Sequence, residues 1–369
     1  MESPMSEGRL LSLDAFRGFT IAGMILVNNP GSWRYVYPPL LHAEWHGWTP
    51  TDLIFPFFLF IVGVSVPFSF GKRLARGDSR TALLLHVVRR SAILFGLGLF
   101  MAAFPRFDLS TLRIMGVLQR IGVVYLLAAP AYLYLGRWGR GALAAALLLG
   151  YWALLTLVPV PGYGTGDLSP EGNLGAYLDR MILGDRLWQG TWDPEGLLSS
   201  LPAVATTLLG IFTGEWLRSG RSRGSKVQGL LAAGVVGVGL GLVWDLVFPI
   251  NKPLWTSSYV LFTAGAGSVL LAGFYWAMEM QGWRTWAKPM VVYGMNAIAV
   301  FVASGLLAKL MGIIRVGVES TSVKAWIYES LFASWAGPLN GSLAFAVSYI
   351  LFWLVLMWML YRRGIFIRI

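Results

Sequence analysis

The chain contains no cysteine among its 369 residues. Disulfide bonds, thiolate nucleophiles and cysteine metal ligands are therefore excluded. Charged side chains are also scarce, at 13% of the residues, against roughly 25% in an ordinary soluble domain. A phosphate-binding loop, a G-x-S-x-G elbow and a dinucleotide fingerprint are missing as well. The sequence thus gives no support to the enzyme classes that these motifs define.

Apolar residues are abundant instead. Hydrophobic side chains make up 56% of the chain, 17 residues are tryptophan, and the mean hydropathy is +0.63. A chain of this composition cannot hide its apolar surface in one globular core, so part of that surface must face lipid. The composition predicts an all-α, polytopic integral membrane protein.

About ten apolar segments approach the ~20 residues that cross a bilayer as a helix. The first 18 residues begin acidic and lack the basic start and small-residue cleavage site of a signal peptide, so the first span is expected to be retained. No internal repeat or separate soluble region is visible, which predicts one transmembrane domain over residues 1–369. The expected spans cover 13–29, 50–70, 88–104, 112–135, 141–159, 197–217, 227–248, 256–278, 288–311 and 340–361.

The net charge of +11 comes from Lys and Arg residues that concentrate in alternate short loops. This bias predicts that the N-terminus and the C-terminus both lie in the cytoplasm. No basic and aromatic patch suggests binding to nucleic acid. The longer loops, near 30–49, 160–196 and 312–339, then fall on the outer side. Long ordered loops are often functional, and the third has the spacing of an amphipathic helix on the membrane surface.

The segment "HAEWHGWTPTD" (42–52) combines a helix start with two histidines. Thr49 and Asp52 form a capping-box pattern around a proline at the first helical position. His42 and His46 precede it, but no third ligand accompanies them, so no metal site is predicted. Histidine titrates near neutral pH and suits general-base chemistry. An alternative is that His42 is simply a polar residue at the membrane interface.

Polar residues within the apolar spans are further candidates. Asn28 falls at the outer end of the first span, where its amide could bind a carbonyl oxygen or a sugar hydroxyl, or merely end the helix. Arg113 and Arg120 are seven residues apart, which would place them on one face of the fourth span, beside Gln119. Arginine suits phosphate binding, although Arg120 could instead pair with a buried carboxylate such as Asp14 or Asp245. Lys252 is a lone cation in a short outer loop, and Asn296 is an amide in an apolar span.

Six segments in this order resemble the heparan-α-glucosaminide N-acetyltransferase family and its bacterial relatives, a group of transmembrane acyltransferases. They span nearly the whole chain. The segments are "LSLDAFRGFTIAGMILVNN", "HAEWHGWTPTDLIFPFFLFIVGVS", "LRIMGVLQRIGVVYLL", "WDPEGLLSSLPAVATTLLGIFTGEWL", "PINKPLWTSSYV" and "YGMNAIAV".

The resemblance implies transfer of acetyl from acetyl-CoA, supplied on the cytoplasmic side, to the amino group of a glucosamine-type sugar on the far side. The family's active-site histidine corresponds to His42, as general base or transient acetyl acceptor, and its functional asparagine corresponds to Asn28. Asp52 would set the geometry at the helix start. On this view CoA contacts Arg113, Gln119 and Arg120, and the sugar contacts Lys252, Trp255 and Trp45.

The expected setting is a bacterial inner membrane, with the active site reaching the periplasmic face. The acceptor would be a small amino sugar or a fragment of cell wall or chitin, and a homodimer remains open. Three alternatives fit the same residues: a transporter of amino sugars, an O-acetyltransferase acting on cell-surface glycans, and a membrane scaffold without enzymatic activity.

Overall fold

The computed structural model describes residues 10–317 and 320–367, so the expectations for residues 1–9, including the absence of a signal peptide, lie outside it. The regular secondary structure of the described residues is helical apart from one short hairpin. Two short 3-10 helices, η1 and η2, precede α2, and two π-helical turns, η3 and η4, follow α9 and α12. The elements are α1 (Leu11–Asn28), η1 (Pro38–Leu40), η2 (Pro50–Leu53), α2 (Ile54–Ala75), α3 (Arg80–Ala103), α4 (Val117–Tyr134), α5 (Arg137–Leu157), α6 (Leu174–Leu183), α7 (Ser200–Arg218), α8 (Arg223–Asp245), α9 (Ser257–Tyr275), η3 (Trp276–Met280), α10 (Lys288–Met295), α11 (Ala297–Ile313), β1 (Arg315–Val316), β2 (Thr321–Ser322), α12 (Val323–Tyr328), η4 (Glu329–Ala333) and α13 (Ser334–Arg362).

The length and apolarity of these helices agree with a membrane protein. Within the described residues, eight helices are long and apolar enough to cross a membrane, and a ninth span is possible if α10 and α11 count as one. These two helices meet at an angle of 82°. The segment expected at 197–217 forms α7, which is not among the eight. The all-α, polytopic prediction is confirmed, with a bent pair where one straight span was expected at 288–311.

One local expectation was wrong, and another holds for part of its segment. The fourth span does not begin near residue 112, because Gly116 is fully extended and α4 starts only at Val117. The helix expected within 312–339 is present but shorter than the loop. The described part of the loop begins with a two-stranded antiparallel hairpin, and the helix then runs from Val323 through α12, η4 and the start of α13 to Gly337, which has a φ of 76°. Glycine adopts this left-handed conformation without strain.

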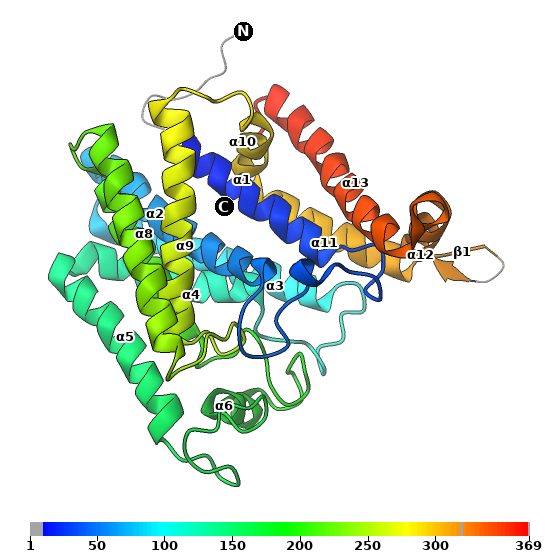
Figure 1. Cartoon of the computed structure of the whole chain (residues 1–369), viewed down its shortest axis with the longest axis horizontal. Coiled ribbons are helices and arrows are strands. Elements are labelled where there is room, and N and C mark those ends of the chain that lie inside the picture. The colour runs from blue at the N-terminus through cyan, green and yellow to red at the C-terminus, as the bar shows by residue number, and fades with distance from the viewer. Residues whose placement is uncertain (1–9, 318–319, 368–369) are drawn as a thin grey trace.

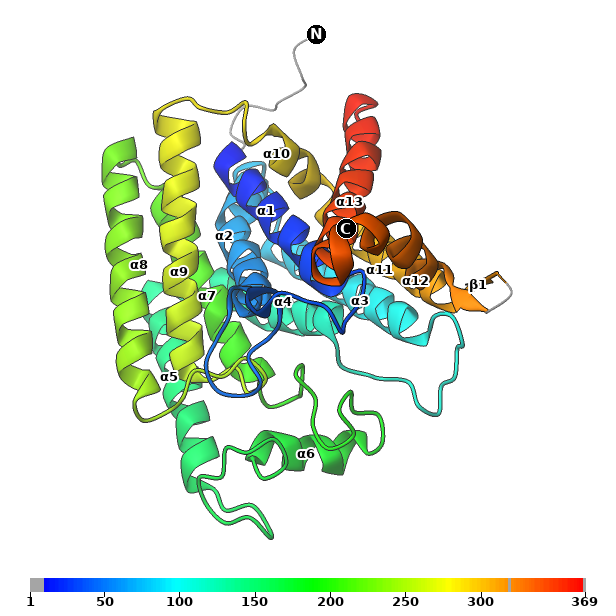
Figure 2. The same cartoon turned by 45° about the vertical axis from the view of Figure 1, so that its right-hand side comes forward.

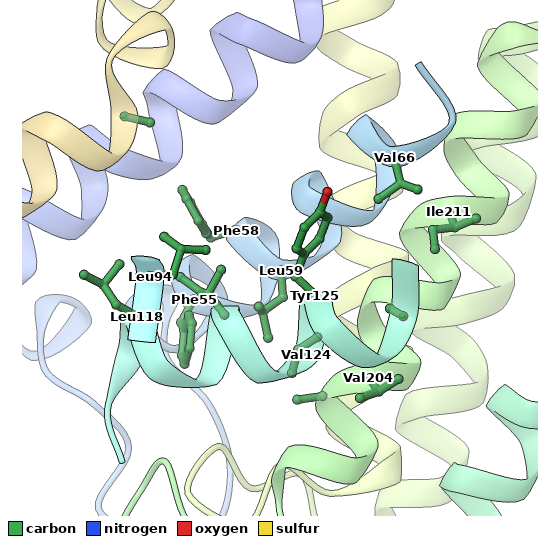
Figure 3. Close-up of a cluster of buried hydrophobic side chains, with 14 of the residues drawn as sticks. Phe55, Phe58, Leu59, Val66, Leu94, Leu118, Val124, Tyr125, Val204 and Ile211 are labelled. Atoms are coloured by element: carbon green, nitrogen blue, oxygen red, sulfur yellow. The ribbon is translucent and has the colours of Figure 1, made fainter. Parts of the chain in front are cut away.

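Helix α2 packs against α1, α4, α7 and α9. Figure 3 shows its aromatic and aliphatic side chains, such as Phe58 and Leu59, against side chains of α3, α4 and α7. Val124 and Ile211 are fully buried in this cluster. In Figures 1 and 2, α8 and α9 run side by side at one edge of the bundle, and the segment containing α6 lies below their lower ends, near the lower end of α5. The loops that carry the candidate site gather at this same end.

Helices α1 and α10 approach each other closely enough to require glycine. A Cβ atom added at Gly18 would lie 1.7 Å from the carbonyl oxygen of Met290, and one added at Gly294 would lie 2.0 Å from that of Asp14. Backbone atoms cannot move aside as a flexible side chain can. The pair of glycines therefore fixes how near α10 stands to α1.

We predict that Gly18→Ala destabilises the protein by about 1–3 kcal/mol, the usual range for overpacking a tight contact. Thermal unfolding in detergent, followed by the loss of monodisperse protein, measures the effect. Gly96→Ala, in α3, is the matched control because nothing lies within 4 Å of its added Cβ. The control should be neutral or slightly stabilising, since alanine favours helix. Equal midpoints for the two variants would contradict the close contact.

The break between α10 and α11 explains the buried amide in the apolar span. Asn296 is 1% exposed and separates the two helices. Its Nδ2 donates to the carbonyl of Ile365 at 3.3 Å, and its Oδ1 accepts from the backbone N–H of Ile367 at 2.8 Å. The amide thus satisfies its polar atoms by fastening the segment that follows α13 to the bend.

Candidate functional site

The site begins where α1 ends. Asn28 is the last residue of α1, as expected, and its side chain is exposed. The chain then runs through a loop and η1 to Thr49, which starts η2. The expected capping box is present: the Thr49 side chain accepts from the backbone at Asp52, and the carboxylate of Asp52 accepts from the Thr49 backbone N–H at 3.0 Å. This cap fixes the end of the loop at the start of η2.

The carboxylate of Asp52 also holds His42. The distance between His42 Nδ1 and Asp52 Oδ1 is 2.6 Å, and the second oxygen, Oδ2, accepts from the backbone N–H of Ala43 at 3.0 Å. The Asp52 side chain is 1% exposed, whereas that of His42 is 49% exposed. With the carboxylate accepting from Nδ1, the imidazole presents the lone pair of Nε2 outward. Asp52 therefore caps the helix and orients the histidine at once.

Lys252 comes to the same imidazole from the loop between α8 and α9. Its Nζ lies 3.0 Å from His42 Nε2, 3.1 Å from His42 Nδ1 and 3.9 Å from Asp52 Oδ1. The loop is held in place by Asn251, whose Nδ2 donates to the carbonyl of Trp45 at 2.9 Å. Burial lowers the pKa of Lys252, and the carboxylates of Glu195 and Asp52 oppose this shift. A cation, an imidazole and a carboxylate thus form one cluster.

These side chains open into a cavity of about 470 Å³, which we call the His42 cavity. Ligand sites are typically concave and in the range of about 300–1,000 Å³. Its wall is rich in aromatic and charged side chains from the loops that Figure 2 shows gathered near α6. The lining includes Asn28, Trp33, His42, Glu44, Trp45, Asp52, Arg113, Trp188, Trp192, Glu195 and Lys252.

Arg113 lines this cavity but is not on the same helix face as Arg120. Arg113 lies before the start of α4 at Val117. The expectation that two helical turns join Arg113 to Arg120 was therefore wrong. Arg113 donates to Asp193 at 2.8 Å and 2.5 Å and to Glu195 at 2.5 Å. Its guanidinium also lies 5.0 Å from the ring centre of Trp188. Arg113 therefore fixes the loop after α6 to the wall of the cavity.

Arg120 and Gln119 line neither this cavity nor the second one described below. Arg120 is fully buried in the first turn of α4. Its Nη2 donates to the carbonyl of Gly196 at 2.9 Å and to Ser199 Oγ at 2.5 Å, and its guanidinium lies 5.2 Å from the ring centre of Trp255. The alternative of an ion pair with Asp14 or Asp245 is not what the structure has: Asp14 pairs with Arg17 at 2.9 Å, and Asp245 accepts from the backbone N–H of Ile250.

The two tryptophans expected near the sugar lie in different places. Trp45 lines the His42 cavity and meets Trp192 edge to face at 5.0 Å. Trp255 is fully buried, packs on Phe55 and Tyr259, and does not reach the cavity. Trp255 instead packs beneath the guanidinium of Arg120, behind the cavity wall.

His46 turns away from His42. Its Nδ1 lies 3.3 Å from Asn251 Nδ2, and burial lowers its pKa against the opposing charge of Asp245. Across the described stretches 10–317 and 320–367, no group of three His, Cys, Asp or Glu side chains is placed to hold a metal ion. Of the two histidines in the loop, only His42 lines the cavity.

A second cavity, of about 260 Å³, lies near the other end of α1; we call it the Arg90 cavity. Arg17 and Asn28 are eleven residues apart on α1, roughly 16 Å along a helix. The Arg90 guanidinium lies 4.9 Å from the ring centre of Tyr125, and among the residues that the structure describes its buried Nε has no hydrogen-bond partner. The lining includes Arg17, Phe58, Ser65, Ser69, Arg90, Tyr125, Met295, Ile298 and Ile367.

A small void separates the two cavities. It shares Phe58 and Ile298 with the Arg90 cavity, and Met24 and Val117 with the His42 cavity. These four shared residues are all apolar, so apolar side chains line the void where it meets each cavity. The sequence analysis missed Arg90, Trp33, Trp188, Trp192 and Glu195 as lining residues. The Trp-rich composition of 160–196 was the signal available for two of them, Trp188 and Trp192.

The fold and the site together define a multi-pass helical membrane protein with a carboxylate-oriented histidine in a cavity at one end of the bundle. The chain belongs to the heparan-alpha-glucosaminide N-acetyltransferase family, because the family model described as "Heparan-alpha-glucosaminide N-acetyltransferase, catalytic" matches residues 9–240, more than half of its length. The resemblance noted from the motifs is thereby confirmed.

Two curated relatives match nearly the whole chain. The human heparan-alpha-glucosaminide N-acetyltransferase is 29% identical over 98% of this chain, and the mouse protein of the same name is 28% identical over 99%. The chain spans 60% of the human protein's length and 61% of the mouse protein's.

Proposed function

We propose that this protein is a membrane-embedded acetyltransferase that moves the acetyl group of acetyl-CoA to the amino group of a glucosamine-type sugar. The observation that carries the proposal is the 2.6 Å contact between His42 Nδ1 and Asp52 Oδ1, with Nε2 facing a tryptophan-lined cavity. Nε2 is placed to take a proton from the attacking amine or to accept the acetyl group itself. Membership of a family named for N-acetyl transfer to a glucosaminide supports the same reaction.

The sugar is proposed to bind in the His42 cavity. Trp33 and Trp188 are 60% and 62% exposed there and offer flat apolar faces to a sugar ring. Asn28 supplies a neutral amide donor for the carbonyl oxygen of the acetyl group. Trp45 forms part of the wall, while Asp52 keeps the imidazole in one orientation.

Acetyl-CoA is proposed to enter through the Arg90 cavity on the cytoplasmic side, with the sugar arriving from the periplasmic face of a bacterial inner membrane. Arg17 and Arg90 provide cationic donors for the CoA phosphates. The pantetheine arm then extends past Phe58 and Val117 towards His42. This assignment replaces Gln119 and Arg120 as CoA contacts, because both are buried outside the two cavities.

The reaction is tested with purified protein in detergent, acetyl-CoA and glucosamine, by following free CoA and N-acetylglucosamine together. Equal amounts of both products are expected. Release of CoA without acetylated amine would point to another acceptor, such as a glycan hydroxyl. If acetyl-CoA neither bound nor turned over, the proposal would be wrong, and a transporter of amino sugars would be the better interpretation of the fold.

The donor route yields a prediction of its own. Arg90→Met should raise the KM for acetyl-CoA about 10- to 100-fold, the loss expected for one charge-assisted contact, and leave kcat nearly unchanged. Arg89→Met is the matched control, because Arg89 is the exposed neighbour on the same helix and lines neither cavity. Equal KM values for the two variants would remove the Arg90 cavity from the route.

A further inference from the structure

Lys252 is mostly buried against the imidazole of His42, a position that a residue contacting only the sugar would not need. Its side chain is 16% exposed and its Nζ lies 3.0 Å from His42 Nε2, the atom that faces the cavity. Hydrogen bonds hold the loop beneath it in place. The backbone N–H of Gly47 donates to the carbonyl of Ile250 at 2.7 Å, and Asn251 Oδ1 accepts from the backbone N–H of Leu254 at 2.8 Å. Lys252 is therefore directed at the imidazole, with Nζ 3.0 Å from Nε2 and 3.1 Å from Nδ1, rather than at open solvent.

The charges around Lys252 come from four elements. His42 belongs to the loop after α1, Asp52 to η2, Glu195 to the segment before α7, and Arg120 to α4. The two carboxylates favour the ammonium form, and the guanidinium of Arg120 disfavours it. Each carboxylate already has another partner: Asp52 holds His42, and Glu195 accepts from Arg113 at 2.5 Å. The ammonium thus retains donors for a new anion formed at His42.

We propose that Lys252 is a catalytic residue whose ammonium stabilises the oxyanion formed during acetyl transfer. The inference rests on the proposed function. The neutral amine attacks the thioester carbon, forming the C–N bond while the C=O electron pair moves onto oxygen. Nε2 of His42 takes the proton from the amine nitrogen. The C=O bond then re-forms, the C–S bond breaks, and the departing CoA thiolate takes the proton from His42 to give amide and free CoA.

The same assignment holds if His42 is acetylated first. In that route Nε2 forms the bond to the thioester carbon, the C–S bond breaks, and the CoA thiolate leaves with the proton from Nδ1. In a second step the amine attacks the acetyl carbon, the C–Nε2 bond breaks, and the freed imidazole takes the proton from the amine nitrogen. Each tetrahedral carbon then carries its oxygen anion next to Nε2, within reach of an ammonium 3.0 Å from that nitrogen. A charged donor at this place acts on the transition state, where the negative charge develops, and less on the bound substrates.

The test compares Lys252→Met with the matched control Lys324→Met, which changes a lysine of α12 that lines neither cavity. Lys252→Met should lower kcat about 10²- to 10³-fold, as removal of one oxyanion donor does, and leave the KM for glucosamine within a few-fold. The control should keep full activity. Size-exclusion profiles and binding of CoA show whether each variant is folded, and Lys252→Gln serves if the methionine variant is not.

The pH dependence separates a charge effect from a packing effect. Activity of the wild type should fall on the alkaline side, because the ammonium is lost as the pH rises through the pKa of Lys252, which burial lowers. Lys252→Arg keeps the charge at all these pH values, so its residual activity should extend to higher pH. If kcat of Lys252→Met stayed within threefold of wild type, or only the KM for glucosamine rose, the assignment would be wrong. A wild type without acetyl transfer would overturn the proposed function and this inference together.

Discussion

Replacing His42 with alanine is expected to lower the rate of acetyl transfer about 10²- to 10⁴-fold, the contribution that a positioned acid–base group makes. The side chain is half exposed into the His42 cavity and its Nδ1 is held by Asp52. Its removal takes away the only imidazole at the cavity wall among the residues that the structure describes. Initial rates of CoA release and of N-acetylglucosamine formation measure the effect.

The variant should still fold, because the carboxylate of Asp52 keeps the backbone N–H groups of Ala43 and Thr49 as partners and an exposed loop side chain contributes few packing contacts. His86→Ala is the matched control, since His86 lies on α3 and lines neither cavity. It should retain the wild-type rate. A His42→Ala protein that is folded and transfers acetyl at the wild-type rate would exclude both the base and the acetyl-acceptor roles.

Asp52→Asn is expected to produce a loss of similar size, about 10²- to 10⁴-fold in kcat. Replacement of the orienting aspartate in serine proteases costs about 10⁴-fold, because the amide holds the imidazole in the wrong tautomer. Here the two carboxylate oxygens accept from His42, Ala43 and Thr49. An amide has one accepting oxygen, so either the cap or the histidine loses its partner. Rates and thermal midpoints measured on the same preparation give both consequences.

Thr49→Ala distinguishes orientation from capping. It removes the hydroxyl of the capping box, which costs about 1 kcal/mol, but leaves both carboxylate oxygens of Asp52 in place. We expect a lower midpoint with a rate within a few-fold of wild type. If this variant lost as much activity as Asp52→Asn, the carboxylate would act by stabilising the loop, and its contact with His42 would be incidental.

The capping box could be predicted because it depends on short-range rules, whereas only the family resemblance singled out His42 beside it. The order Thr49, Pro50, Asp52 defines a helix start whatever surrounds it, and the structure has this cap. The end of α1 at Asn28 is similarly local, since Pro30 follows it. The class of fold followed from composition, which determines the solvent that the helices must face.

The arginines show where local rules fail. The spacing of Arg113 and Arg120 indicates one face only if a helix joins them, and Gly116 breaks that continuity. Their partners, among them Asp193 and Ser199, lie about 80 residues along the chain, so no nearby pattern reveals them. Lys252 was visible as a lone cation, but its contact with an imidazole 210 residues away depends on how α8 and α9 bring their loop to the site.

The contacts of Asn296 affect how the protein would resist a mechanical force that pulls on the segment after α13. Its amide ties the residues after α13 to the bend between α10 and α11 at two points. A force applied to the segment after α13 would load these two hydrogen bonds before it could unwind α13 turn by turn. Tension would then pass to α10, and through the glycine contact to α1. The first and last long helices would thus resist extraction as one mechanical unit rather than as the loose ends of the chain.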